Sequence, residues 1–143
     1  MKPKYPDPAR VWQRVLPTAP QEQQSLQMLL RQLSQDLAFL KQLSKTGEEA
    51  TLGLLIREYT GQLHCLKGIL ILTGGTVPRT APTCPPDHSL RRCFDGALQR
   101  LGAWQLRSSD PIYGPVFRDL AHQTQHHCRS ITELLGSGRQ MGI

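Results

Sequence analysis

A seam of leucines near the start of the chain constrains the fold more than any other feature. The spacing alternates between four and three residues across Leu26, Leu30, Leu33, Leu37 and Leu40. Such a spacing gives an α-helix one continuous apolar stripe, as in the helices of an antiparallel bundle. The seam therefore predicts a first helix that follows Pro20 and runs to about Lys45.

A second helix is expected to begin at Thr46, because Glu49 three residues later completes a capping box. It runs to about Thr73, and the pair Gly74-Gly75 ends it. The stretch from Thr76 to Asp87 contains four prolines, so we expect an extended linker there rather than a helix.

Two more helices complete the predicted architecture. Asp87 is expected to cap the third helix, with a seam of Leu90, Phe94, Ala97, Leu98 and Leu101. After a tight break at residues 108–111, the fourth helix runs to Leu135. The short joins make each neighbouring pair of helices an antiparallel hairpin. The linker of about 14 residues, at ~3.1 Å per residue, is long enough to cross the whole bundle. The sequence thus predicts an all-α fold, a four-helix bundle of two helical hairpins joined by a long crossover.

The 143-residue chain is expected to form one domain with two short flanking segments. The bundle occupies residues 20–136. Residues 1–19 form an N-terminal arm with a short helix, on which Trp12 and its aliphatic neighbours share one face. Residues 137–143 form a flexible C-terminal tail.

Composition restricts the partners and the compartment. The net charge is +6, but Lys and Arg are scattered without a dense run, so a solvated basic surface is expected rather than a nucleic-acid-binding one. The first residues lack the apolar core of a signal peptide, and the longest apolar stretch, 63–72, is too short to span a membrane. We therefore expect a cytoplasmic protein with no membrane partner. The cysteines show neither CxxC nor zinc-finger spacing and are expected to be free thiols: Cys65, Cys84, Cys93 and Cys128.

Two stretches of the chain carry a resemblance to a known family. The first is Gly53–Gly75, which ends in the apolar run 66–74, and the second is Tyr113–Ala121, which leads into His126-His127. They resemble the ferritin-like superfamily, especially its small rubrerythrin-like bacterial members. The resemblance covers most of residues 20–136 by pattern and architecture rather than by a strict motif. It implies a homodimer and a carboxylate-bridged metal pair, held by a Glu on helices one and three and a Glu-x-x-His on helices two and four.

Helical wheels at about 100° per residue place other residues in the interior. The inward polar positions of the second and fourth helices are Tyr59, Gln62, Thr124 and His127. Glu58 lies at the edge of that face, and His64 points away. The first helix turns Leu33 and Leu37 inward with Asp36 to one side, and the third offers Ala97 and Leu98. Such a set cannot neutralise two divalent cations in a low-dielectric core, so the di-iron site is expected to have been lost.

Three interpretations of His127 follow from its inward position. It is a core histidine hydrogen-bonded to Tyr59, Thr124 or Gln62, a ligand of a single metal ion, or a general base in a small-ligand pocket. Glu58 and His64 are the candidate co-ligands if the helix phase is wrong. A separate pair, His122 and His126, has chelating i, i+4 spacing but lies opposite the core face, which favours a solvated surface pair.

The outer face of the second helix is also apolar. Its members are Gly61, His64, Gly68 and Ile71, joined by Leu54 and Leu72. A helix that is apolar nearly all round is buried on both sides, and small residues allow a second helix to approach closely. This face is therefore expected to form a homodimer interface, with packing of the N-terminal arm as the alternative.

Two functions are compatible with these observations. The favoured one is a ferritin-like bundle that has lost its di-iron site and acts, without a cofactor, as a non-catalytic interaction or small-ligand-binding protein. The alternative is a metal-binding ferritin-like protein, an oxidoreductase or a metal-handling protein, with iron, manganese or zinc at an unusual site around His127.

Overall fold

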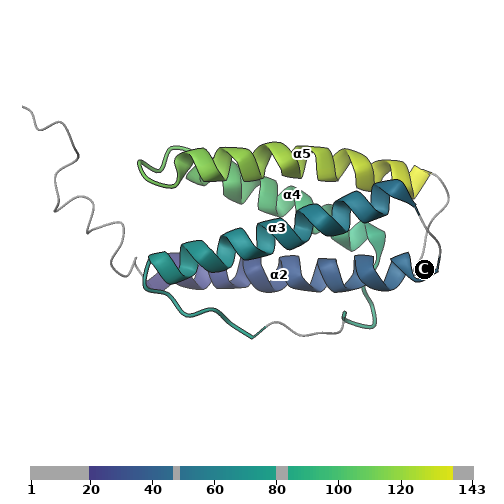
Figure 1. The fold of residues 1–143 in the computed structure, drawn as a ribbon, viewed down its shortest axis with the longest axis horizontal. Helices are drawn as coiled ribbons and strands as arrows, with labels where there is room; N and C mark the ends of the chain where they lie inside the picture. Colours follow the sequence, from purple (N-terminus) through teal and green to yellow (C-terminus); the bar gives the residue numbers. More distant parts are fainter. Residues whose placement is uncertain (1–19, 47–48, 80–83, 137–143) are drawn as a thin grey trace, which may run out of the picture.

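The computed structural model describes residues 20–46, 49–79 and 84–136. Within these ranges the chain forms four helices: α2 (Pro20–Ser44), α3 (Ala50–Leu72), α4 (Leu90–Arg107) and α5 (Gly114–Gly136). No strand occurs in the described part of the chain. The predicted all-α four-helix bundle is therefore confirmed (Figure 1). The predicted arm (1–19) and tail (137–143) lie outside the described residues.

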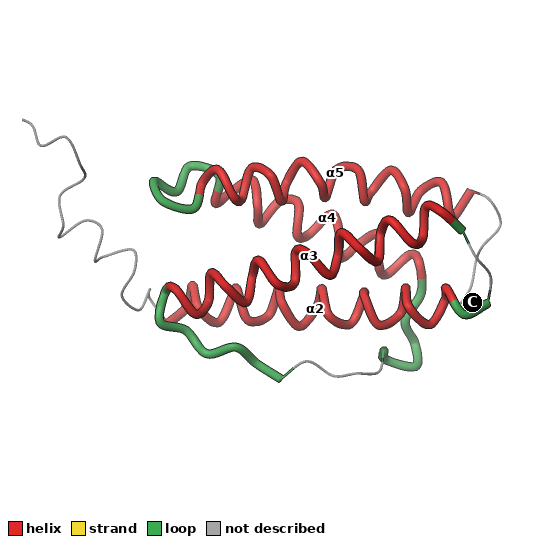
Figure 2. Tube along the Cα trace, in the orientation of Figure 1, coloured by secondary structure: helices red, strands yellow, loops and turns green. Residues whose placement is uncertain are grey.

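The helices pack as two antiparallel pairs, α2 with α3 and α4 with α5 (Figure 1). α3 ends at one end of the bundle and α4 begins at the other, so these two helices run in the same direction (Figure 2). Residues 73–79 of their connection leave the end where α3 finishes and run along the bundle, and residues 84–89 lie toward the end where α4 begins (Figure 2). None of the four helices combines the length and the apolar character needed to cross a membrane.

The start of α3 differs from the prediction. The helix begins at Ala50, with Glu49 as its N-cap, rather than at Thr46. Thr46 lies in the turn that follows α2 instead, where its hydroxyl donates to the carbonyl of Leu43 at 2.7 Å. The predicted end is confirmed: Gly74 has a φ of 80°, a conformation that favours glycine, and ends the helix.

The cap of α4 also differs from the prediction. Ser89, rather than Asp87, is the N-cap, and its side chain accepts a hydrogen bond from the backbone N–H of Arg92 at 3.2 Å. Asp87 forms an exposed ion pair with the Arg92 side chain at 3.0 Å. The two-residue difference places His88 directly before the first turn of α4.

The break between α4 and α5 is confirmed as a tight turn. The Asp110 carboxylate accepts hydrogen bonds from the backbone N–H groups of Ile112 and Tyr113, both at 2.9 Å. Gly114 is needed at the end of this turn, because a Cβ there would lie 2.6 Å from the carbonyl oxygen of Ser108.

The core contains the predicted leucine seam of α2, each member at most 5% exposed. The predicted seam of α4 is partly wrong. Leu98 is 47% exposed, whereas Arg100 and Trp104 are buried. α4 is rotated relative to the prediction because Trp104 stacks on Phe117 of α5, with ring centroids 5.8 Å apart, and Arg100 finds charged and polar partners inside the bundle.

Candidate functional site

A chain of polar side chains crosses the interior of the bundle. It begins in the loop before α4 and includes residues from all four helices: Cys93, His88, Asp36, Arg100, Tyr59, His127 and Glu58. Asp36 divides it into two parts. We call Arg100, Tyr59, His127 and Glu58 the central cluster, and His88, Cys93 and Cys84 the loop-side cluster.

The link between the two parts is a buried ion pair. Arg100 is 1% exposed, and its Nη1 donates to Oδ2 of Asp36 at 2.7 Å. Its Nη2 donates to the Tyr59 hydroxyl at 3.2 Å, and its guanidinium carbon lies 5.3 Å from the centroid of that ring. Burial alone would lower the pKa of Arg100, but Tyr59 and Asp36 together raise it above the ordinary value. The guanidinium is therefore a permanent cation inside the bundle.

Asp36 was expected to lie beside the core face of α2, and this placement is wrong. The side chain is buried, with only 2% of the residue exposed, because Arg100 supplies the opposite charge that makes its burial tolerable. Gly96 allows α4 to come this close. A Cβ at Gly96 would lie 2.8 Å from Oδ2 of Asp36 and 3.1 Å from Nη1 of Arg100.

His127 lies on the other side of Tyr59. The residue is 1% exposed, and its ring centroid is 4.8 Å from that of Tyr59. Its hydrogen-bond partner is Oε1 of Glu58 at 3.0 Å, so the expected bond to Tyr59, Thr124 or Gln62 is not the one that forms. Burial, aided by the charges of Arg100 and His126, lowers the pKa of His127 from 6.5 to about 3. The Glu58 carboxylate acts in the opposite direction, but it lies at the edge of the bundle with a side chain 29% exposed.

Gln62 and Thr124 form a second interior group between α3 and α5. Nε2 of Gln62 lies 3.3 Å from the Thr124 hydroxyl and 3.2 Å from Oε1 of Gln123. The Thr124 hydroxyl donates to the carbonyl of Leu120 at 2.7 Å. Oε1 of Gln62 is buried without a hydrogen-bond partner in the described structure. The four predicted interior residues are therefore all buried, but they divide into Tyr59 with His127 and Gln62 with Thr124.

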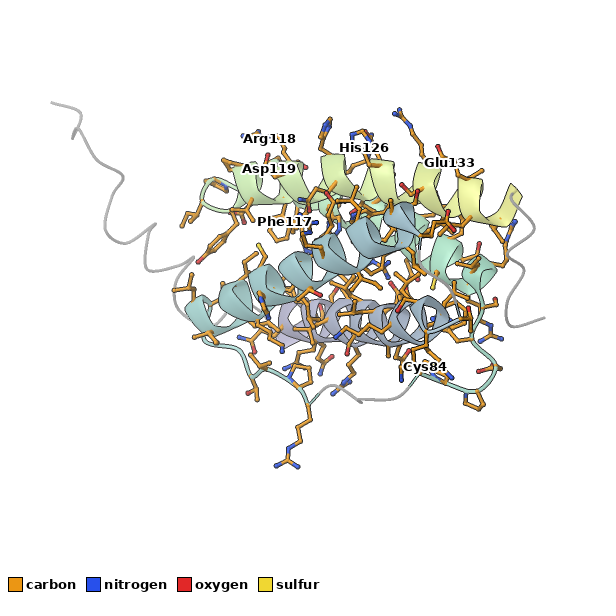
Figure 3. The ribbon with its side chains drawn as sticks, turned by 45° about the vertical axis from the view of Figure 1, so that its right-hand side comes forward. Cys84, Phe117, Arg118, Asp119, His126 and Glu133 are labelled. Atoms are coloured by element: carbon orange, nitrogen blue, oxygen red, sulfur yellow. The ribbon has the colours of Figure 1, made fainter. Side chains whose placement is uncertain are left out.

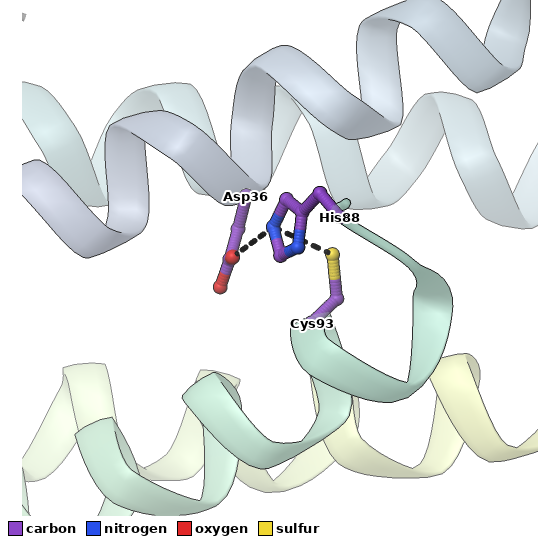
Figure 4. A group of neighbouring side chains, drawn as sticks. All are labelled: Asp36, His88 and Cys93. Atoms are coloured by element: carbon purple, nitrogen blue, oxygen red, sulfur yellow. Dashed lines mark hydrogen bonds and ion pairs between the residues drawn. The ribbon is translucent and has the colours of Figure 1, made fainter. Parts of the chain in front are cut away.

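The loop-side cluster has a different geometry (Figure 4). Nε2 of His88 lies 2.7 Å from Oδ1 of Asp36 and 3.8 Å from Sγ of Cys93. His88 comes from the loop, Asp36 from α2 and Cys93 from α4. Burial, together with the charge of Asp36, raises the pKa of the Cys93 thiol well above its usual range. Within the described residues, these three are the one group of three ligand-type side chains whose donor atoms all lie within 4.8 Å of one another.

This cluster is not a nucleophilic triad. In a Cys-His-Asp triad the imidazole takes the thiol proton on one nitrogen, while the carboxylate holds the N–H of the other nitrogen and so orients the ring. Here one nitrogen of His88 faces both partners. The raised pKa of Cys93 also disfavours the thiolate that a nucleophile requires.

The remaining histidines lie on the surface. His122 and His126 are exposed, with ring centroids 5.1 Å apart, so their predicted surface position is confirmed. His126 projects from the outer side of α5 (Figure 3). His64 is exposed on α3, and the ligand-type group described above includes neither His64 nor His127.

The residues of the central cluster do not fit the di-iron centre that the ferritin-like resemblance implies. Such a centre uses four carboxylates and two imidazoles to offset two divalent cations. The central cluster and Asp36 together offer two carboxylates and one imidazole, and one of these carboxylates is already paired with the Arg100 guanidinium. A fixed cation at this place repels a metal rather than holding one.

The sequence prediction missed Arg100, His88 and Cys93. The spacing Cys84-x3-His88-x4-Cys93 is the one sequence signal that pointed to the loop-side cluster. Comparison with known protein families, with curated proteins and with solved structures finds no match, so geometry alone carries the functional argument.

Proposed function

We propose that this protein is a ferritin-like bundle that has replaced di-iron chemistry by an internal ion pair and acts as a non-catalytic interaction protein. The observation that carries the proposal is the Arg100 guanidinium, which bonds Asp36 at 2.7 Å in the interior where the family would place metal. The charge of the central cluster is balanced by its own side chains. No redox step is expected there.

The arrangement of the helices supports the ferritin-like part of the proposal. Two antiparallel pairs, with α3 and α4 running in the same direction, are what a hairpin, a long crossover and a second hairpin produce. Simple up-and-down bundles alternate the direction of every successive helix instead.

The outer face of α3 supports the interaction part. Leu54, Ile71 and Leu72 are 49%, 65% and 57% exposed. Gly61 and Gly68 lie on the same face, and a Cβ at either would meet open space within the described structure. A glycine in a helix interior costs about 0.5–1 kcal/mol relative to alanine, and nothing within the described bundle requires these two. A second copy of the chain, with its α3 packed closely across these glycines, accounts for both the apolar surface and the small residues.

The loss of chemistry is tested by loading untagged protein with Fe²⁺ without oxygen and then admitting air. The expected result is no iron retained per chain after desalting, and oxidation no faster than in buffer. Two irons per chain, or rapid oxidation, would show that the central cluster holds metal despite Arg100.

The interface is tested by matched glycine variants. Gly61→Leu and Gly68→Leu should give a monomer by light scattering with unchanged helical circular dichroism, because the new side chains block close approach of a partner. Gly102→Leu is the matched control, since a Cβ at Gly102 of α4 also meets open space but lies on a different helix. It should leave the dimer intact. A wild-type monomer would refute the homodimer.

The alternative function, a metal protein centred on His127, has one observation in its favour. Nε2 of His127 and Oε1 of Glu58 lie 3.0 Å apart and are both ligand types. If it is correct, the metal content will fall in Glu58→Gln and not in His64→Ala or His122→Ala.

A further inference from the structure

The loop-side cluster has the geometry of ligands that surround one ion. Nε2 of His88 faces both Oδ1 of Asp36 and Sγ of Cys93, a poor arrangement for hydrogen bonding because one N–H cannot serve two acceptors well. Around a single cation, by contrast, each ligand atom is expected to face the others.

The distances approach those of a tetrahedral zinc site. Zinc binds sulfur at about 2.3 Å and nitrogen or oxygen at about 2.0–2.2 Å, so neighbouring ligand atoms lie about 3.3–3.7 Å apart. The separation of 3.8 Å between His88 and Cys93 is close to this range. The contact of 2.7 Å between His88 and Asp36 must open by about 0.6 Å to reach it.

Cys84, in the same loop as His88, is the candidate for a fourth ligand, although its Sγ lies outside the group whose donor atoms are within 4.8 Å of one another. It lines, together with His88, a surface pocket of about 300 Å³. The Cys84 side chain must therefore move toward His88 to bind the same ion. The Cys84 thiol at present contacts Oε1 of Gln42 at 2.7 Å and would exchange this contact for the ion.

The charges of the site also balance. A zinc ion with two thiolates and one carboxylate has a net charge of minus one, which the buried Arg100 guanidinium neutralises. Arg100 already holds Oδ2 of Asp36 at 2.7 Å and leaves Oδ1 directed toward His88. In metal sites, a side chain that hydrogen-bonds to a ligand in this way fixes the orientation of that ligand.

From this geometry we infer that Asp36, His88, Cys93 and Cys84 form a zinc site that fastens the loop before α4 to α2. Binding displaces the protons of both thiols, so the ion replaces two S–H groups and one shared hydrogen bond. The site shares Asp36 with the buried ion pair, but it involves neither His127, Glu58 nor the outer face of α3. Its failure would therefore leave the proposed function untouched.

The test is a titration of full-length, reduced, untagged protein with Zn²⁺ and then with Co²⁺ as a coloured substitute. One ion per chain is expected, with tetrahedral cobalt absorption and a thiolate-to-cobalt band. Cys93→Ala should weaken zinc binding by more than about 100-fold. Removal of a side chain that only hydrogen-bonds to a ligand already weakens metal binding about 10–100-fold, and Cys93 is itself a proposed ligand. Cys84→Ser, at a half-buried loop position, should reduce the thiolate band and provides the second variant if Cys93→Ala does not fold.

Matched controls distinguish this site from others. Cys65→Ala and Cys128→Ala remove half-buried thiols outside the cluster and should leave binding unchanged. The double variant His122→Ala/His126→Ala removes the surface pair and should also have no effect. Absence of zinc binding would overturn the inference, as would binding that survives Cys93→Ala or that is lost only in the surface-pair variant. Cobalt absorption unchanged in Cys84→Ser would remove Cys84 from the ligand set.

Discussion

The two oxygens of Asp36 face two environments, and the difference between them explains much of the interior. Oδ2 contacts Arg100 in the central cluster, where every charge has a protein partner. Oδ1 contacts His88 in the loop-side cluster, where a nitrogen, an oxygen and a sulfur atom all lie within 4.8 Å of one another. The first environment is closed and permanent, whereas the second is suited to an added ion. One carboxylate thus serves as an ion-pair partner on one side and as a potential metal ligand on the other.

The largest expected effect on stability comes from removing the Arg100 guanidinium. Arg100→Met leaves the Asp36 carboxylate, in a residue 2% exposed, without its charged partner. Loss of one member of a buried pair costs about 3–5 kcal/mol, and urea denaturation should show a decrease of that size in the free energy of unfolding. A loss below about 1 kcal/mol would mean that Asp36 is neutral in the folded protein, and the comparison between the two environments would fail.

The control for Arg100→Met removes both charges. Asp36→Leu/Arg100→Met should be much more stable than Arg100→Met alone, because apolar replacement of a whole buried pair is often neutral or stabilising. The same double variant should lose zinc binding, since it removes a ligand. Recovery of stability together with loss of zinc would separate the two roles of Asp36.

The helices and the inward positions of Tyr59 and His127 were predictable from the sequence, but the buried position of Arg100 was not. Leu26 and Leu30 repeat at helical spacing, and such a pattern fixes both the helix and its buried face. Arg100 and Leu98 break that rule in opposite directions, since the charged residue is inside and the apolar one is 47% exposed. A wheel built on hydrophobicity cannot identify a buried arginine, because its burial depends on a carboxylate 64 residues away.

The second prediction concerns the space between α4 and the ion pair. Gly96→Ala places a Cβ 2.8 Å from Oδ2 of Asp36 and should destabilise the protein by up to about 3 kcal/mol, as overpacking does. Gly102→Ala lies on the same helix with open space around its Cβ and should stabilise it by about 0.5–1 kcal/mol. Thermal melts of the two variants should shift in opposite directions. Equal shifts would show that α4 does not need to approach Asp36 closely.

The third prediction uses acid to probe the central cluster. Between pH 6.5 and about 3 the unfolded chain protonates His127, while the folded protein keeps it neutral, so stability is lost as the pH falls. The loss due to this residue is about 2 kcal/mol at pH 5, at about 1.36 kcal/mol for each pH unit. In His127→Leu this part of the acid sensitivity should disappear, with stability at pH 7.5 little changed.

Two further variants show which neighbouring side chains determine the pKa of His127. His126→Ala removes an exposed imidazole whose charge lowers the pKa of His127, and should shift the acid transition only slightly. Glu58→Gln removes the carboxylate that favours the imidazolium and should leave the acid loss at least as steep. A wild-type protein that loses no stability between pH 6.5 and 5, while Glu58→Gln does lose stability there, would mean that a charged His127–Glu58 pair exists in the folded protein.

The loop-side cluster was missed for a different reason. The chain has neither CxxC nor zinc-finger spacing, whereas the residues of this cluster follow Cys84-x3-His88-x4-Cys93 and lie beside Asp36 of another helix. The erroneous cap contributed, because Asp87 as N-cap would have placed His88 inside α4. With Ser89 as the cap, His88 belongs to the loop and can reach α2.

The smallest expected effect tests this dependence on the cap. Ser89→Ala removes the acceptor for the Arg92 N–H and should cost about 1 kcal/mol of stability, whereas Ser89→Asn should retain most of it. Because the cap holds the turn that carries His88, the alanine variant should also bind zinc more weakly although every ligand is still present. Calorimetric titration of both variants checks this. Zinc affinity that is equal in the two would mean that Asp36 and Cys93 position His88 without help from the cap, and the loop-side cluster would then be as rigid as the central one.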